Sequence, residues 1–167
     1  MGIWAARLLL DRIETVEQNE ERFACALEAA AFFNKVEGIR LLLDKGVDVN
    51  TQGGMVGNAL QVAASKANIE AIRLLLDKGV DVNIQGGEYG NALQTAVSWA
   101  NEEVIRLLLD GGADINIEGG GYGNVLQAAV CNASIEVIRL LLDRGGDLIS
   151  RVEIMAMHCK RQYIGPT

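Results

Sequence analysis

The chain has 167 residues, 50% of them hydrophobic and 22% charged, which is enough to bury one hydrophobic core as a single domain. Fifteen Lys and Arg against 22 Asp and Glu leave a formal net charge of −7, which argues against a nucleic-acid partner held by phosphate neutralisation. The 19 glycines against a single proline are unusual, because turns normally use both residues.

The three cysteines, Cys25, Cys131 and Cys159, show neither CxxC spacing nor a Cys/His ligand pattern, which argues against a disulfide framework and against structural zinc. We therefore expect reduced thiols, no metal or other cofactor, and an intracellular location, cytoplasmic or nuclear. The N-terminus carries no basic leader or small-residue cleavage site, and no segment approaches 18 uninterrupted apolar residues. Neither secretion nor membrane insertion is predicted.

An internal repeat of 33 residues runs through the chain. The string RLLLD begins at five positions, each 33 residues after the last, and two other strings keep the same period. The RLLLD strings begin at Arg7, Arg40, Arg73, Arg106 and Arg139; VDVN or ADIN begins at Val47, Val80 and Ala113; GNALQ or GNVLQ begins at Gly57, Gly90 and Gly123. Residues 1–167 are therefore predicted to form one array.

In chain order, the array begins with a partial repeat at 1–11 and a diverged repeat at 12–44, in which the charged stretch RIETVEQNEERF replaces a glycine loop. Regular repeats follow at 45–77, 78–110 and 111–143, and a basic, amphipathic capping segment at 144–167. The leucines at 8–10 lack a preceding helix to cover them, and terminal repeats need a polar outer face. Three interpretations stay open: this end packs differently, it self-associates, or the sequence was cut from a longer protein.

Each regular repeat predicts two short helices, because L-Q-x-A-A/V and I-R-L-L-L both carry apolar residues at helical spacing. Asparagine or serine before each helix can cap its first turn, and glycine after the second helix suits a left-handed end. The expected caps are Asn58, Asn91 and Asn124 for the first helices, Asn68, Asn101 and Ser134 for the second helices, and the expected ends are Gly46, Gly79, Gly112 and Gly145.

These residues resemble the ankyrin repeat, whose pattern runs G-x-T-P-L-H-x-A-A-x-x-G-H-x-E-I-V-x-L-L-L-x-x-G-A-D-V-N. The matching residues of one repeat are Leu93, Ala96, Glu103, Val104, Ile105, Leu107, Leu108, Leu109, Gly112, Ala113, Asp114, Ile115 and Asn116. The resemblance implies a mainly α solenoid of stacked helix-turn-helix units with glycine-rich hairpin loops. It also implies that Gln61, Gln94 and Gln127 bond between backbone groups of neighbouring repeats.

The departures from the family pattern are regular. T-P-L-H is replaced by N-A-L-Q, and the glycine before the second helix is replaced by Ala67, Ala100 and Ala133. This Q-G-G-x-Y-G-N-A-L-Q variety is similar to ankyrin arrays of filamentous fungi.

No residue pattern is diagnostic of catalysis or of metal binding. His158 and Cys159 are adjacent, and neighbours on a helix point about 100° apart, so they do not face each other as a base and a nucleophile would. The run of glycines at 119–123 lacks the preceding strand and the G-K-S/T ending of a phosphate loop, and sister loops at 53 and 86 identify it as a hairpin. Cys25 is expected to be small and buried, whereas Cys131 lies at a surface-facing position.

The resemblance implies a concave surface built from the hairpin tips and the exposed side of the first helices. The residues expected there are Phe32, Phe33, Met55, Val56, Ser65, Lys66, Glu88, Tyr89, Ser98, Trp99, Gly121, Tyr122, Cys131 and Asn132. Exposed aromatic residues are favoured binding anchors, so Trp99, Tyr89 and Tyr122 are the strongest candidates. The competing interpretation is that Phe32 or Phe33 packs inside and that the tyrosines only fill the glycine loops.

Two functions from different classes remain. The first is a protein-binding module whose groove presents aromatic anchors to an unidentified partner, which the acidic charge predicts to be neutral or basic. The alternative is an enzyme, cyclase- or isomerase-like, that holds a small apolar molecule in the same groove, with Glu88, Tyr89 or Tyr122 as the catalytic candidates. A deep, closed pocket would favour the enzyme, and a shallow, open groove would favour protein binding.

Overall fold

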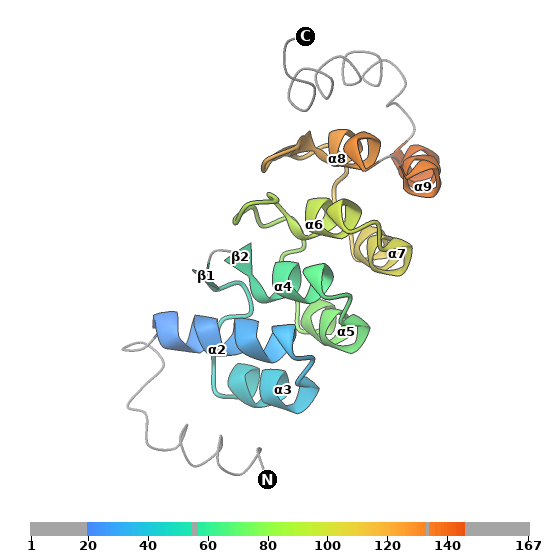
Figure 1. The fold of residues 1–167 in the computed structure, drawn as a ribbon. Coiled ribbons are helices and arrows are strands. Elements are labelled where there is room, and N and C mark those ends of the chain that lie inside the picture. The colour runs from blue at the N-terminus through green and yellow to red at the C-terminus, as the bar shows by residue number, and fades with distance from the viewer. Residues whose placement is uncertain (1–19, 55–56, 133, 146–167) are drawn as a thin grey trace.

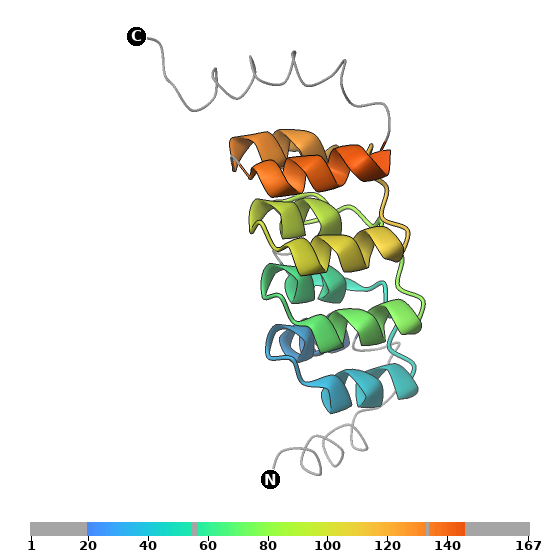
Figure 2. The same cartoon turned by 90° about the vertical axis from the view of Figure 1, so that its right-hand side faces the viewer.

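Paired helices stack one unit upon the next along the chain (Figure 1). The structure, a computed structural model, describes residues 20–54, 57–132 and 134–145. The first helices of the units are α2 (Glu20–Phe32), α4 (Ala59–Ser65), α6 (Ala92–Ser98) and α8 (Val125–Cys131), and the second helices are α3 (Val36–Asp44), α5 (Ile69–Asp77), α7 (Glu102–Asp110) and α9 (Ile135–Gly145). Neighbouring first helices contact one another, and the second helices form a layer on their other side (Figure 2). The mainly helical solenoid is confirmed.

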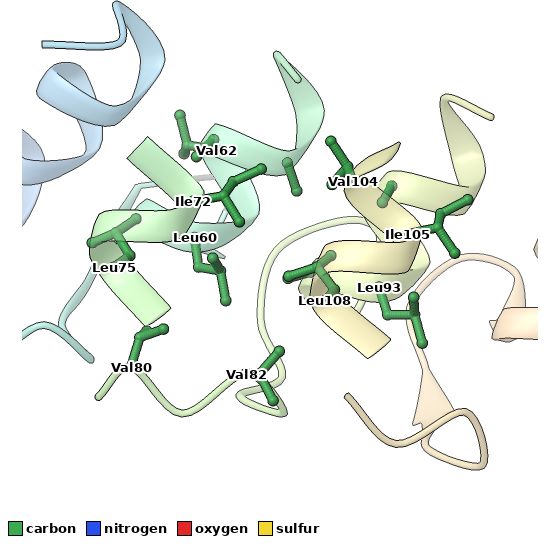
Figure 3. Packing of buried hydrophobic residues seen from close by; sticks show 14 of the residues in the cluster. Leu60, Val62, Ile72, Leu75, Val80, Val82, Leu93, Val104, Ile105 and Leu108 are labelled. Atoms are coloured by element: carbon green, nitrogen blue, oxygen red, sulfur yellow. The ribbon is translucent and has the colours of Figure 1, made fainter. Parts of the chain in front are cut away.

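The core lies between the two layers of helices. Each second helix is amphipathic: in α5, Ile72 and Leu75 are fully buried, whereas Arg73 between them is exposed. The first helix α4 is buried along nearly its whole length, because it packs against neighbours on both sides as well as against α5. Figure 3 shows how Leu60 gathers with the apolar residues of its own repeat, and how the next repeat repeats the arrangement.

A short hairpin precedes each regular first helix. Strand β1 (Gln52–Gly54) pairs antiparallel with β2 (Gly57–Asn58), and β3 (Glu118–Gly119) pairs with β4 (Gly123–Asn124). Between these two hairpins, Gly86 and Gly90 form an isolated bridge at the equivalent place. The hairpins project from the first-helix side of the stack (Figure 1), where the candidate site is found.

The G-N-A-L-Q motif builds the start of each regular first helix. In the first copy, Asn58 Oδ1 accepts a hydrogen bond from the Gln61 N–H at 2.9 Å, and Gln61 Oε1 accepts one from the Asn58 N–H at 2.8 Å. The preceding Gly57 has φ +116°, and a Cβ on it would collide with the Gln61 Oε1. Glycine is therefore required by the glutamine that follows it four residues later.

The same glutamines hold neighbouring repeats together. Gln61 Nε2 donates to the carbonyl oxygens of Gly86 at 3.1 Å and Gly90 at 2.9 Å, and Gln94 Nε2 donates to the Gly119 carbonyl at 2.9 Å. The inter-repeat role expected of Gln61 and Gln94 is confirmed. These bonds fix both ends of the segment that carries Glu88 and Tyr89.

The D-x-N motif forms a second connection between repeats. Asn50 Oδ1 accepts from the Asp81 N–H at 2.8 Å, and Asn83 Oδ1 accepts from the Asp114 N–H, also at 2.8 Å. Within its own loop, the Asp81 carboxylate accepts from the Asn83 N–H at 2.9 Å. The recurrence of both residues in the sequence follows from these paired contacts.

Most of the predicted helix ends are confirmed, with two exceptions. Asn58, Asn91 and Asn124 cap the first helices, Asn101 and Ser134 accept from first-turn amides, and Gly46, Gly79 and Gly112 have φ of 89°, 79° and 91°. The prediction for Asn68 is wrong: its side chain donates to the carbonyls of Ala31 and Phe32 at 2.7 and 2.9 Å instead of capping α5. Gly145 is the last residue of α9 rather than a position beyond the helix.

Non-glycine residues occupy a left-handed position between the two helices of a repeat. Asn34, Ala67 and Ala100 have φ of 51°, 55° and 51°. A Cβ is unfavourable in this region, which explains why the resembling pattern has glycine here. Two of the three residues directly follow candidate binding residues, Lys66 and Trp99.

Several predictions fall outside the described residues, namely those on 1–19, Met55, Val56, Ala133 and 146–167, which include His158 and Cys159. The described end of the charged stretch, from Glu20, forms the first turn of α2. None of the described helices combines the length and hydropathy that crossing a membrane requires.

Candidate functional site

An open groove of about 590 Å³ lies over the first two described units. Its walls come from α2, from the end of α4, from the segment between Gly86 and Gly90, and from the residue that follows α6. The side chains that line it are Cys25, Glu28, Ala29, Phe32, Phe33, Val62, Ser65, Lys66, Glu88, Tyr89 and Trp99. We call this the aromatic groove.

Three large aromatic side chains of the groove are open to solvent. Phe32, Phe33 and Trp99 expose 43%, 65% and 58% of their surface. The rings of Phe32 and Phe33 meet edge to face, with 5.0 Å between their centroids and 71° between their planes. Exposed apolar area costs free energy in water, so this surface can gain free energy when a partner covers it.

Lys66 supplies the one basic side chain among the residues that line the groove. Its Nζ lies over the Phe32 ring, 4.5 Å from the centroid, within the range of a cation–π contact. Lys66 occupies the same place in its repeat as Phe33 and Trp99 do in theirs, because the three positions are 33 residues apart. Aromatic, basic and aromatic residues therefore succeed one another along the stack.

Two carboxylates line the groove and differ in their engagement. Glu28 stands where the next repeats have glutamine, and its Oε1 accepts a hydrogen bond from the Gly53 N–H at 2.7 Å. Glu88 is exposed, and its carboxylate makes no hydrogen bond or ion pair with the residues that the structure describes. Its backbone carbonyl accepts from the Gly121 N–H at 2.9 Å, which ties the segment to the next hairpin.

Cys25 lies on the groove wall, and the expectation that it is buried is wrong. It is a free, exposed thiol whose Sγ donates to the Gly53 carbonyl at 3.4 Å. It faces outward because the buried residues of α2 are Phe23, Ala24 and Leu27, which leaves position 25 on the opposite side of the helix.

Half of the binding residues named from the sequence meet in this groove. They are Phe32, Phe33, Lys66, Glu88, Tyr89 and Trp99, and Ser65 joins them. The interpretation that Phe32 or Phe33 packs inside is wrong, since both rings are largely exposed. Of the catalytic candidates, Glu88 and Tyr89 line the groove and Tyr122 does not.

The remaining candidates lie elsewhere in the described chain. Ser98 Oγ donates to the Gln94 carbonyl at 2.8 Å, and Asn132 Nδ2 donates to the Ala128 carbonyl at 3.0 Å. Tyr122 is half-buried and packs against the hydrophobic core. Cys131 is half-buried and disulfide-bonded, which corrects the expectation of three reduced thiols.

The sequence did not single out four of the lining residues, Cys25, Glu28, Ala29 and Val62. The register contained a signal for two of them, because Ala29 and Val62 are 33 residues apart and stand one helical turn before Phe32 and Ser65. Cys25 and Glu28 had no such signal. Helix α2 is 13 residues long, against 7 for α4, so it adds a turn that the regular repeats lack.

No set of three or more His, Cys, Asp or Glu side chains in the described segments is arranged to hold a metal ion. The chemistry on offer in the groove is therefore that of contact: aromatic faces, one ammonium group, two carboxylates, one thiol and two hydroxyl groups.

Comparison with protein families gives one match. The family model described as "Ankyrin repeats (3 copies)" matches residues 27–119 and, in a second placement, residues 60–152. The two placements together span residues 27–152 and overlap by whole repeats, as a periodic sequence allows. No curated protein matches the chain.

Proposed function

Because the chain belongs to the ankyrin repeat family, whose members generally bind proteins, we propose that it is a protein-binding module that uses the aromatic groove to hold a segment of its partner. The observation that carries this proposal is the exposure of Phe32, Phe33 and Trp99 along a single groove. Aromatic side chains contribute much of the binding energy at protein interfaces, since they bury a large area at a low entropic cost.

The construction of the groove supports the proposal. The frame beneath it is buried and rigid: Leu27, Leu60 and Leu93 are essentially inaccessible to solvent, and the glutamine bonds join adjacent repeats. A preorganised surface loses little conformational entropy when a partner binds. Recognition residues carried on such a frame can vary while the fold is kept.

The shape of the groove favours a protein segment over the substrate of an enzyme. The groove is open to solvent along its length rather than enclosed. Catalysis on a small apolar molecule benefits from exclusion of water, which an open surface does not provide. Glu88 and Tyr89 then act as polar contacts at the rim, as is common in interfaces.

Selection from a library of random peptides tests the proposal directly. Peptides that bind the wild-type chain should lose about tenfold or more in affinity when Trp99→Ala and Phe33→Ala are combined, because both anchors are removed. Ile135→Ala is the matched control, since Ile135 is 59% exposed but does not line the groove. Peptides that bind both variants equally well would contradict a role for the groove, and so would a selection that yields no binder.

A folding control separates loss of anchors from loss of structure. Because Phe33 and Trp99 are mostly exposed, the double variant should keep the helical circular-dichroism spectrum and nearly the same melting temperature. A large drop in melting temperature would instead identify these rings as part of the framework.

A further inference from the structure

The aromatic groove already binds one cation, and that cation is its own. Lys66 extends from the end of α4 so that its ammonium group lies 4.5 Å from the centroid of Phe32, a residue of the preceding repeat. Such a contact is weak at an exposed site, so the lysine side chain can leave the ring for water at little cost. The arrangement demonstrates that the face of Phe32 in this groove is accessible to an ammonium or guanidinium group.

The charges around the groove also favour a cationic occupant. Its lining residues include two carboxylates, Glu28 and Glu88, and one ammonium group, that of Lys66. The Glu28 carboxylate is engaged by the Gly53 N–H, whereas the Glu88 carboxylate makes no polar contact within the described residues. The chain as a whole carries a net charge of −7, which attracts a basic partner and repels an acidic one.

We propose that the partner segment carries a lysine or arginine whose cationic head takes the place of Lys66 on the Phe32 ring, beside the carboxylate of Glu88. This inference rests on the proposed function and names the chemistry of the partner. Lys66 then acts as an internal competitor: it covers the aromatic face in the free protein and withdraws to solvent when the partner binds. The exposed rings of Phe33 and Trp99 receive the apolar part of the same segment.

The internal competitor gives the proposal an unusual sign. Removing a basic residue from a binding groove weakens an acidic partner, but here Lys66→Gln should strengthen binding, because the Phe32 face no longer has to be vacated. The expected gain is about two- to fivefold in affinity, which is the range of an exposed cation–π contact. Replacing the basic residue of the bound peptide with glutamine should weaken binding by a similar factor or more.

A matched control separates this local effect from net charge. Lys35→Gln removes one positive charge from an exposed lysine that does not line the groove. Any general gain in attraction for a cationic peptide should therefore appear equally in Lys35→Gln and should fade at high salt. The gain specific to Lys66→Gln should persist at high salt, because it comes from competition for one ring.

The experiment is a random-peptide selection on the wild-type chain, with counter-selection on the Phe33→Ala, Trp99→Ala variant, followed by affinity measurements on the best peptide. The proposal predicts that groove-dependent peptides are enriched in lysine or arginine and bind Lys66→Gln more tightly than Lys35→Gln. Groove-dependent peptides that are acidic, or weaker binding to Lys66→Gln, would overturn the proposal and leave the binding function standing. Failure to obtain any groove-dependent peptide would overturn both.

Discussion

Gln61 of one repeat is bonded to Gly90 of the next: its Nε2 donates to the Gly90 carbonyl oxygen at 2.9 Å, while its Oε1 accepts the Asn58 N–H at 2.8 Å. A single buried side chain thus completes a helix cap and joins two repeats. The bond also fixes the base of the segment that carries Glu88 and Tyr89 into the aromatic groove.

Gln61→Leu should lower the free energy of unfolding by about 1–3 kcal/mol, because it leaves a buried amide and buried carbonyls without partners. Urea denaturation followed by circular dichroism measures this. Gln127→Leu is the matched control, since the Gln127 side chain has no bond to another repeat within the described residues. Equal losses for the two variants would show that the inter-repeat bond adds nothing to stability.

Ala100→Gly should stabilise the chain by about 0.5–1 kcal/mol, because Ala100 has φ 51° and glycine accepts the left-handed region without a Cβ clash. Thermal unfolding of the variant measures the gain. Ala26→Gly, at an exposed position inside α2, should have the opposite sign and cost about 1 kcal/mol. Destabilisation by both substitutions would contradict the strain assigned to position 100.

Asn34→Gly should raise the pKa of Glu70. The pKa of this exposed carboxyl is lowered from its ordinary 4.5, first by the hydrogen bond from Asn34 Nδ2 at 3.0 Å and further by backbone hydrogen bonding and by Arg73. Since the folded-state pKa is lowered, the contribution to stability is complete above the ordinary pKa and is lost as the pH falls through the lowered value. Glycine keeps the left-handed backbone at position 34, where φ is 51°, so the variant removes the bond without adding strain.

Nuclear magnetic resonance titration of the Glu70 side-chain carboxyl carbon measures this shift. The titration midpoint should move toward the ordinary value in the variant. An unchanged midpoint would show that the Asn34 contact is not what lowers the pKa.

Alkylation of Cys25 should block the aromatic groove. Cys25 is a free, exposed thiol on the groove wall, so a bulky maleimide attached to it occupies space that a bound segment needs. A peptide selected for groove binding should lose about tenfold or more in affinity for the alkylated chain, and its presence should slow the alkylation. Cys25→Ser treated with the same reagent should bind as the untreated chain does. Full binding to the alkylated wild-type chain would remove Cys25 from the binding surface.

The repeat sequence predicted the frame of the molecule well, because frame residues recur every 33 positions and each has a local physical reason. Asn58 and Gly46 could be read as a helix cap and a helix end from their positions alone. Asn68 could not, because its side chain is used by the carbonyls of Ala31 and Phe32 in the preceding repeat rather than by its own helix. Local patterns do not reveal that kind of competition.

The candidate site was only half predictable. The register identified Phe33, Lys66 and Trp99 as equivalent positions on one face, and all three line the groove. It could not reveal that the groove is confined to the first two described units, which depends on the extra length of α2. It also could not reveal that Tyr122 packs against the core while Tyr89 lines the groove, because the two tyrosines stand at equivalent positions in their repeats.

The most direct test of the binding proposal is the indole N–H resonance of Trp99 in the intact chain, followed while a selected peptide is added. The chain has two tryptophans, and Trp4→Phe leaves Trp99 as the single indole signal. Binding in the aromatic groove predicts a saturable shift of this signal, together with shifts of backbone amides in α2 and at the end of α4. Saturable binding that leaves the Trp99 indole and these amides unmoved would contradict the account, because the partner would then be held elsewhere on the molecule.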